Sequence, residues 1–263
     1  MYSQYGMAKL SVIPCRSEPS SKSEMTTQLL FGEAYKVLEQ HQKWYKIKMD
    51  ADGYECWINE LQHFPITEEF YFLQQKTPRY YSSELLQIVQ SGQNHYVVPM
   101  GSHFPMYQNH QFKIESSIYE CYGKVTEITN NTRYDGQKCV DFAFMFLNAP
   151  YLWGGKTLMG IDCSGLVQVC CALAGYQLPR DAKDQVHHGT PLSFLDEVQA
   201  GDIAFFHNEE GNIVHTGILI NSETIIHASG KVRIDKIDHY GIFSPELKNY
   251  SHHLRVIKRL CSP

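Results

Sequence analysis

Short apolar segments separated by polar turns run through the first sixty or so residues. Residues 44–48 (WYKIK) alternate with a period of two, which is typical of a half-buried strand. The pair Asp52-Gly53 is a hairpin-turn signal, and residues 54–58 supply the returning strand. Shorter apolar segments at residues 8–13 and 28–38 flank a loop rich in Ser and Pro. Several short strands joined by tight turns predict a small β-barrel over residues 1–63.

The pattern from residue 64 to residue 127 is less regular. Residues 78–88 predict a short helix and residues 92–96 a turn, whereas residues 96–102 and 118–123 look like strands. The length and the strand spacing favour a second, degenerate SH3-like β-barrel in this region.

Longer apolar segments begin near residue 129. Residues 136–147 predict a helix that ends before Pro150, and residues 163–174 predict a second helix with Gly175 as its C-terminal cap. Strands are expected at residues 202–207, 213–220, 224–228 and 254–260. Helices followed by antiparallel strands indicate an α+β domain over residues 128–263.

Composition excludes several classes of protein. The chain is 43% hydrophobic and 19% charged, its net charge is −5, and it has no Lys/Arg-rich run, so we expect no nucleic-acid partner. It has no apolar run of membrane-spanning length and no apolar signal-peptide core near its start, so we expect no membrane partner and a cytoplasmic location, or a periplasmic or secreted one if a leader was removed. Eight cysteines form no C-x-x-C pair, and we expect reduced thiols. No HExxH motif, zinc-ligand spacing or phosphate loop occurs, so we expect no cofactor and no metal.

Candidate chemistry centres on Cys163, which follows Asp162 where a loop turns into a helix. The positive end of a helix lowers the pKa of a thiol and favours the nucleophilic thiolate. The alternative interpretation of Cys163 is a buried structural cysteine.

A thiol nucleophile needs a base, and thirteen histidines are available. His215 and His227 lie on consecutive predicted strands, which can bring their side chains together. The other histidines, His252 and His253 among them, accompany no matching motif and are interpreted as core or surface residues, an alternative that also stays open for His215 and His227.

Six motifs in the second half resemble those of the NlpC-type cell-wall peptidases, a group of papain-like cysteine peptidases. They are PYxWGG (150–155), GxDCSGLV (160–167), PRDxxxQ (179–185), GDIAFF (201–206), HxGI (215–218) and IHA (226–228). The resemblance implies that Cys163 is the nucleophile, His215 the general base and acid, and His227 the residue that orients it. It also implies that Tyr151 assists at the oxyanion, together with the backbone N–H of Cys163.

The same resemblance gives substrate-binding roles to Asp162, Ser164 and Asp181. Each also has a plainer interpretation: Asp162 and Ser164 as helix-capping residues, and Asp181 as the partner of Arg180 in a loop ion pair. A common family variant has Ser where this chain has Ala182, so a hydroxyl contact from that position is missing.

The first barrel resembles a bacterial SH3-like domain through its LLFGE, WYKIK and DGYECWI segments. SH3-like barrels followed by an NlpC-type domain resemble the γ-D-glutamyl-L-diamino acid endopeptidases of murein peptides. In that subgroup the first barrel closes one end of the catalytic groove and restricts substrates to a free N-terminal L-Ala. This implies that Glu24 and Tyr54 contact the terminal amine.

The sequence thus predicts a cysteine peptidase, expected to be a monomer, that hydrolyses the γ-D-glutamyl–diamino acid bond of murein peptides during cell-wall peptide recycling. Two alternatives stay open: a secreted hydrolase of intact peptidoglycan stem peptides, and a non-catalytic peptidoglycan-binding protein.

Overall fold

The structure is a computed structural model that describes residues 4–244 and 248–260. Two compact units divide the chain. Unit 1 runs to Asn131 and also includes Trp153–Thr157, and unit 2 consists of Thr132–Leu152 and the residues from Leu158 onward. Each unit is described by itself.

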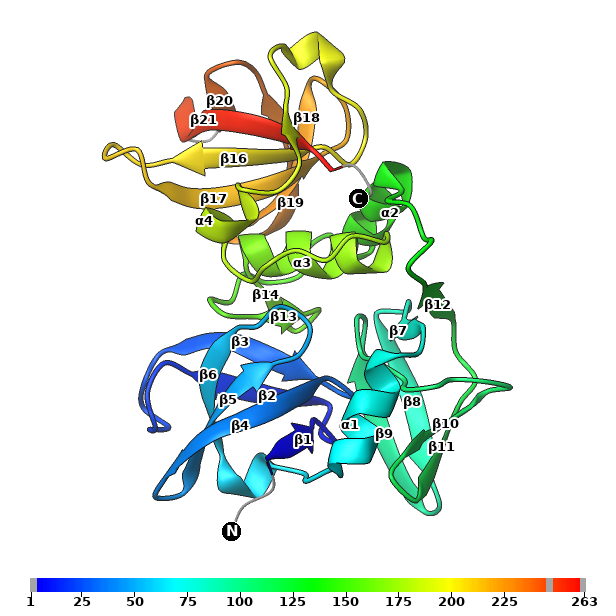
Figure 1. Cartoon of the computed structure of the whole chain (residues 1–263). Helices are drawn as coiled ribbons and strands as arrows, with labels where there is room; N and C mark the ends of the chain where they lie inside the picture. The colour runs from blue at the N-terminus through cyan, green and yellow to red at the C-terminus, as the bar shows by residue number, and fades with distance from the viewer. Residues whose placement is uncertain (1–3, 245–247, 261–263) are drawn as a thin grey trace. The chain divides into compact units, whose positions relative to one another are not determined.

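Unit 1 begins with a six-stranded antiparallel sheet in the order β1-β4-β5-β6-β2-β3 (Figure 1). The strands are β1 (Tyr5–Met7), β2 (Val12–Arg16), β3 (Met25–Leu30), β4 (Ala34–His41), β5 (Trp44–Met49) and β6 (Glu55–Asn59). In β5 the side chains of Ile47 and Met49 are buried, whereas that of Lys48 between them is exposed, which confirms the predicted alternation. The inward residues of this sheet form a core that includes Ile13, Leu29 and Tyr35.

The second part of unit 1 contains the 3-10 helix Glu60–Gln62, helix α1 (Glu68–Gln75) and six further strands. These are β7 (Arg79–Ser82), β8 (Leu86–Ser91), β9 (Asn94–Pro99), β10 (Gln111–Ile114), β11 (Ser117–Cys121) and β12 (Val125–Ile128). Four of them form a sheet in the order β10-β11-β8-β9, and β7 pairs with β12. Side chains from both parts of unit 1, such as Phe31 and Phe112, share one buried cluster.

The helix predicted at residues 78–88 is wrong, because β7 and β8 occupy these residues. The helix of this region lies ten residues earlier, at α1. Its N-cap Thr67 accepts a hydrogen bond from the backbone N–H of Phe70, and Glu68 and Glu69 follow in the first turn. Thr-Glu-Glu is a start signal that complements the helix dipole, and it marks α1 in the sequence.

Unit 2 packs helices against a sheet that closes on itself. Its helices are α2 (Gly136–Met145), α3 (Cys163–Leu173) and α4 (Ala182–Gln185), with a 3-10 turn at Leu195–Glu197. Its strands are β14 (Gly160–Ile161), β15 (Thr190–Pro191), β16 (Ile203–His207), β17 (Ile213–Leu219), β18 (Thr224–Ser229), β19 (Lys231–Ile237), β20 (Gly241–Ser244) and β21 (Asn249–Arg259). The order is β15-β21-β16-β17-β18-β19-β20, and β20 also pairs with β21.

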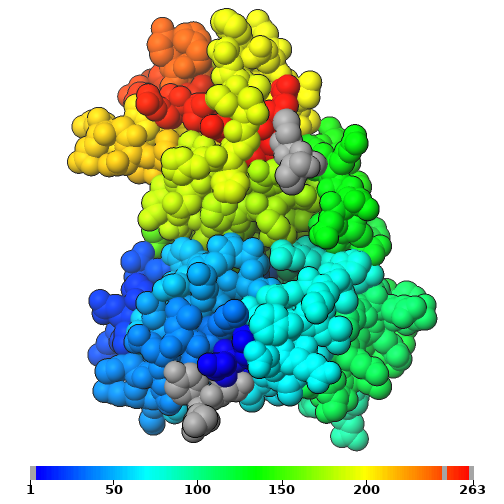
Figure 2. All heavy atoms as spheres, in the orientation of Figure 1, coloured from blue at the N-terminus to red at the C-terminus, as the bar shows by residue number. Residues whose placement is uncertain are grey.

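The two long helices of unit 2 confirm the predictions at residues 136–147 and 163–174. Strands β19 and β20 were not predicted, and β21 begins five residues before the expected strand at residue 254. The turn between β16 and β17, at residues 208–212, projects from unit 2 (Figure 2).

Seven cysteines lie in the described part of the chain, and all are free thiols, as expected; Cys261 lies outside the described residues. Among the helices of the described residues, none combines the length and apolar character needed to cross a membrane.

Candidate active site

Cys163 is the first residue of α3, and its side chain is almost fully buried. Asp162 caps the helix, because its Oδ1 accepts the backbone N–H of Gly165 at 2.7 Å. The backbone N–H groups of Ser164 and of Thr216, the residue after His215, interact with the Cys163 sulfur. The α3–β17 packing therefore places the thiol beside the strand that carries His215.

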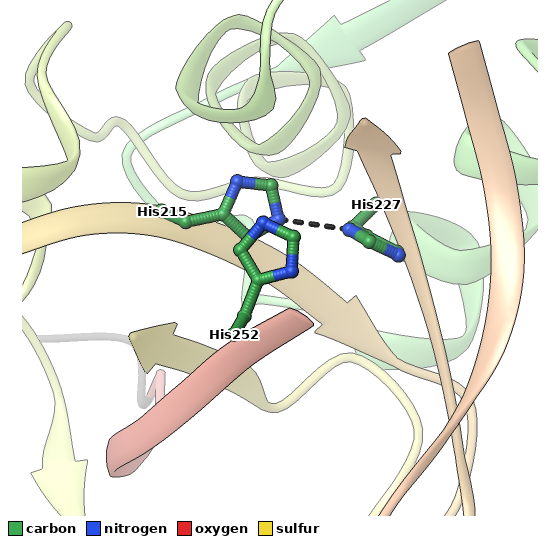
Figure 3. Close-up of side chains that lie close together, drawn as sticks. All are labelled: His215, His227 and His252. Atoms are coloured by element: carbon green, nitrogen blue, oxygen red, sulfur yellow. Dashed lines mark hydrogen bonds between the residues drawn. The ribbon is translucent and has the colours of Figure 1, made fainter. Parts of the chain in front are cut away.

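His215 on β17 and His227 on β18 are hydrogen-bonded, with 2.8 Å between Nε2 of His215 and Nδ1 of His227 (Figure 3). Both side chains are buried, at 6% and 1% exposure. The expectation that adjacent strands bring these two imidazoles together is confirmed. Gly217 makes room for the pair, because a Cβ at this position would lie 2.8 Å from Cβ of His227.

His252 of β21 was interpreted from the sequence as a surface or core histidine, yet it belongs to this cluster. Its ring stacks on that of His215, with 4.0 Å between centroids and 27° between planes (Figure 3). Burial, followed by the proximity of His227, lowers the pKa of His252 to about 4. Sequence reasoning did not place His252 on a strand, because the strand predicted from residue 254 begins two residues after it.

Asp235 of β19 is a second residue that sequence reasoning did not find. Its Oδ2 lies 2.9 Å from Nε2 of His227, and Arg233 contacts both carboxylate oxygens of Asp235. Burial raises the pKa of Asp235, but the hydrogen bonds from His227 and Arg233 outweigh this effect and hold it below the ordinary value. Since β19 was not predicted, the sequence offered no reason to place Asp235 next to His227.

Burial sets the protonation of the central groups. It raises the pKa of the Cys163 thiol to about 11, with a contribution from the negative charge of Asp162. It also lowers the pKa of His215 well below its ordinary value. The backbone N–H of Ser164 at the helix start does lower the pKa of Cys163, as expected, but loss of hydration outweighs this effect and the net shift is upward. A neutral thiol lies beside the strand that carries the neutral imidazole of His215, so the thiol requires a base when it attacks.

Tyr151 is half-buried and forms a backbone bridge with Ile161, next to the start of α3. Burial and the nearby Cys163 and Asp162 raise the pKa of Tyr151 to about 12. Its hydroxyl therefore keeps its proton at neutral pH and can donate a hydrogen bond to a developing oxyanion.

Arg180 neutralises the carboxylate next to the thiol. Its guanidinium is buried and binds Asp162 through two hydrogen bonds, Nη2 to Oδ2 at 2.6 Å and Nη1 to Oδ1 at 3.1 Å. Nη1 also donates to Oγ of Ser164 at 2.8 Å. Arg180 therefore forms its ion pair with Asp162, and the carboxylate of Asp181 instead lies 3.7 Å from Nζ of Lys183. Burial raises the pKa of Asp181.

Glu24 and Tyr54 belong to unit 1. Glu24 is exposed, and its Oε1 accepts a hydrogen bond from Nε1 of Trp153 at 2.5 Å. Trp153 lies two residues after Tyr151 in the chain but belongs to the segment Trp153–Thr157, which is part of unit 1. Tyr54 is half-buried and packs against the core of the first sheet.

That segment is held firmly within unit 1. Nζ of Lys156 lies 3.0 Å from Oε1 of Glu33 in a buried ion pair, and the backbone N–H of Lys156 donates to Oε1 of Gln28. Gly154 adopts a positive φ of 77°, and a side chain there would collide with the carbonyl oxygen of Met25. Strand β13 (Lys156–Thr157) ends the segment.

The three histidines also offer nitrogens within 4.8 Å of one another, a spacing found in metal sites. However, both nitrogens of His227 are already hydrogen-bonded, and the rings of His215 and His252 are stacked. Stacked imidazoles direct their in-plane lone pairs along nearly parallel planes and not at a common point. The arrangement therefore suits proton transfer better than metal coordination.

A helix-borne thiol beside a hydrogen-bonded pair of histidines defines the class of thiol-dependent hydrolases. Residues 148–249 match the model of the NlpC/P60 family, and residues 15–62 match that of the bacterial dipeptidyl-peptidase Sh3 domain. The chain therefore contains an NlpC/P60 cysteine peptidase domain and, before it, a bacterial SH3 domain.

Two curated relatives cover most of the chain. A γ-D-glutamyl-L-lysine dipeptidyl-peptidase of Bacillus subtilis is 28% identical over 77% of this chain and 71% of its own length. Dipeptidyl-peptidase 6 of Lysinibacillus sphaericus is 24% identical over 84% of this chain and 88% of its own. A crystal structure of an NlpC/P60 family protein from Bacillus cereus has a TM-score of 0.82 and 18% identity, and the match covers 97% of this chain and 99% of that chain. This last likeness concerns the fold.

Proposed function

We propose that this protein hydrolyses the bond between γ-D-glutamate and a diamino acid in murein peptides that carry a free N-terminal L-Ala. The observation that carries the proposal is the hydrogen bond between His215 and His227 in the unit whose helix α3 begins at Cys163. The names of the two relatives, both dipeptidyl-peptidases and one specific for γ-D-glutamyl-L-lysine, support the substrate class.

In the proposed reaction the Cys163 sulfur attacks the γ-carbonyl carbon while His215 takes the thiol proton. The tetrahedral oxyanion receives hydrogen bonds from the backbone N–H of Cys163 and from Tyr151. Collapse of this intermediate breaks the amide bond, and the proton on His215 passes to the leaving amine of the diamino acid. Water, deprotonated by His215, then hydrolyses the thioester and releases the dipeptide.

Substrate binding is assigned as part of the same proposal. Asp162 and Ser164 are polar groups next to the nucleophile, and their pairing with Arg180 holds them in a fixed orientation. Asp181 is a further polar candidate. For Glu24 and Tyr54 we propose contact with the terminal ammonium of the substrate. A carboxylate and a phenol oxygen can both accept hydrogen bonds from an ammonium group. We also propose that residues 64–127 form a degenerate SH3-like barrel, and that the protein is a cytoplasmic monomer.

The test compares L-Ala-γ-D-Glu-diamino acid with the same tripeptide acetylated at its N-terminus. We expect release of the free diamino acid from the first peptide only, and no release by a Cys163→Ala variant. Failure to cleave either peptide would contradict the proposed activity, and equal cleavage of both would contradict recognition of the amine.

Intact peptidoglycan is the third substrate in the comparison. If stem peptides in the polymer are cleaved faster than the free tripeptide, the secreted-hydrolase alternative replaces the recycling role. If the Cys163→Ala variant binds peptidoglycan as tightly as the parent and neither protein cleaves any substrate, the chain acts as a binding protein.

A further inference from the structure

Four polar side chains of unit 2 come from helix α3 and from three consecutive strands, and the three on the strands are joined by hydrogen bonds. Cys163 begins α3, His215 lies on β17, His227 on β18 and Asp235 on β19. Nε2 of His215 lies 2.8 Å from Nδ1 of His227, and Nε2 of His227 lies 2.9 Å from Oδ2 of Asp235. The role of the first three is part of the proposed function, on which this inference rests, but nothing so far explains Asp235.

The carboxylate of Asp235, at one end of this series, fixes the direction of both hydrogen bonds. An ionised carboxylate only accepts hydrogen bonds, so Nε2 of a neutral His227 must carry the proton that Asp235 receives. Nδ1 of His227 then has a lone pair and accepts a hydrogen bond. Consequently Nε2 of His215 is the donor in the bond between the two imidazoles.

This direction decides which nitrogen of His215 is basic. A neutral imidazole with its proton on Nε2 has its lone pair on Nδ1, the nitrogen that is not bonded to His227 (Figure 3). Nδ1 is therefore free to take the Cys163 proton. In the opposite direction, Nδ1 of His227 would donate to Nε2 of His215. A neutral His215 would then carry its proton on Nδ1, and no lone pair would remain there to take the thiol proton.

We propose that Asp235 is a positioning residue that sets the tautomer of His227 and, through it, the tautomer of His215. Asp235 touches neither the thiol nor the scissile bond. It keeps both imidazoles protonated on Nε2 in the resting protein, so that every encounter with substrate finds the lone pair on Nδ1 of His215.

The surroundings of Asp235 keep it an acceptor. Nε of Arg233 lies 2.6 Å from Oδ2 and Nη2 lies 2.8 Å from Oδ1, so the guanidinium stabilises the ionised carboxylate. The pKa of Asp235 is accordingly held below its ordinary value despite burial. His252, which is packed against His215 and His227, has a pKa lowered to about 4 and adds no positive charge at neutral pH.

No proton needs to reach Asp235 during the reaction. When the S–H bond of Cys163 breaks, its proton forms a new N–H bond on Nδ1 of His215, which becomes an imidazolium. The N–H bonds on Nε2 of both histidines stay in place, and the proton later leaves Nδ1 for the amine of the product. His227 and Asp235 stabilise the imidazolium through the aligned hydrogen bonds.

Nitrogen-15 NMR of the full-length protein, labelled in its histidines, tests the proposal without any substrate. Spectra of His215→Gln and His227→Gln variants assign the two rings. At pH 7 we expect each ring of the parent to carry its proton on Nε2 and its lone pair on Nδ1. The Asp235→Asn variant should populate the form of His227 protonated on Nδ1, because an amide can donate as well as accept.

Two further variants separate this role from folding. Asp235→Glu keeps a carboxylate and should keep the parental tautomers. Asp238→Asn is the matched control, because Asp238 accepts from Tyr250 and not from a histidine, and it should change neither ring. On a substrate that the parent cleaves, kcat/KM should fall between about tenfold and a hundredfold in Asp235→Asn, the range that loss of an orienting hydrogen-bond partner typically costs at a metal-bound histidine.

Unchanged tautomers in Asp235→Asn, or a doubly protonated His227 in the parent at pH 7, would overturn the proposal whichever peptides the protein cleaves. Failure to find a peptide substrate would instead count against the proposed function alone, since the NMR experiment reads the resting protein.

Discussion

Replacement of Arg180 by methionine should destabilise unit 2 by about 4 kcal/mol at pH 7. The side chain of Arg180 is 1% exposed and that of its partner Asp162 is 6% exposed, so solvent cannot replace the lost partner. Methionine keeps much of the apolar stem of the arginine, which limits the change to the charge and its hydrogen bonds. Removal of one partner from a buried ion pair typically costs about 3–5 kcal/mol because it leaves an uncompensated charge.

Proton uptake sets a ceiling on this cost. Without its partner, the carboxylate can take up a proton and become neutral. For an ordinary aspartic acid of pKa about 3.9, protonation costs about 1.36 kcal/mol for each pH unit above that pKa, or about 4 kcal/mol at pH 7. At pH 5 the same ceiling is only about 1.5 kcal/mol. The destabilisation caused by Arg180→Met should therefore shrink as the pH falls, which a simple packing defect would not do.

The assay must report on unit 2. All three tryptophans, Trp44, Trp57 and Trp153, belong to unit 1, so their fluorescence does not follow the unfolding of unit 2. Cys170 and Cys171 are fully buried in α3, and pulsed alkylation in a urea series, followed by mass spectrometry of their peptide, measures the free energy of unfolding of this unit.

Two controls complete the experiment. Asp162→Asn in the Arg180→Met background should recover most of the lost stability, because an asparagine still caps α3 and carries no charge. Arg255→Met removes an exposed arginine from β21 and should change stability by less than about 0.5 kcal/mol. A loss below about 1 kcal/mol for Arg180→Met at pH 7, or an equal loss at pH 5 and pH 7, would refute the reasoning.

Three further predictions concern other parts of the molecule. Because the pKa of Cys163 is about 11, its alkylation by iodoacetamide should accelerate about tenfold per pH unit from pH 7 to pH 9; a rate that is constant over this range would instead reveal a thiolate–imidazolium pair with His215. A Gly217→Ala variant should lower kcat/KM by at least about tenfold while it stays folded by circular dichroism, because the new methyl group would press on His227; full activity would show that the two strands yield to it. Burial lowers the pKa of His103 to about 4, so the unfolded chain binds a proton at this residue between pH 6.5 and pH 4 and the folded one does not. Unit 1 should therefore lose up to about 3 kcal/mol as the pH falls through this window, measured by urea unfolding with tryptophan fluorescence, and a His103→Gln variant should lack this component; an equal loss in the variant would assign the acid sensitivity to other groups.

Local patterns in the sequence were sufficient for the main elements of unit 2. The apolar run after Cys163 predicted α3, and Gly175, which has a positive φ of 99°, follows that helix as its predicted cap. Alternation predicted β17 and β18, and with them the pairing of His215 and His227, because neighbouring antiparallel strands leave few ways to place two inward side chains. These inferences held because each depends on residues close together in the chain.

Contacts between distant residues were decided only by the tertiary structure. His252 reaches His215 because β21 pairs with β16, the neighbour of β17, and no local pattern specifies that pairing. Asp235 lies on a strand whose alternation of lysine, arginine and aspartate is too polar to predict burial, yet it bonds to His227. Likewise the Arg180–Asp162 ion pair joins residues eighteen positions apart. The pKa of Cys163 depends on the residues that cover the thiol, because burial raises it while the N–H groups at the helix start lower it. The sequence by itself indicated Cys163, His215 and His227 as the groups proposed to carry the chemistry. Their protonation and orientation depend on packing, which involves residues far apart in the chain.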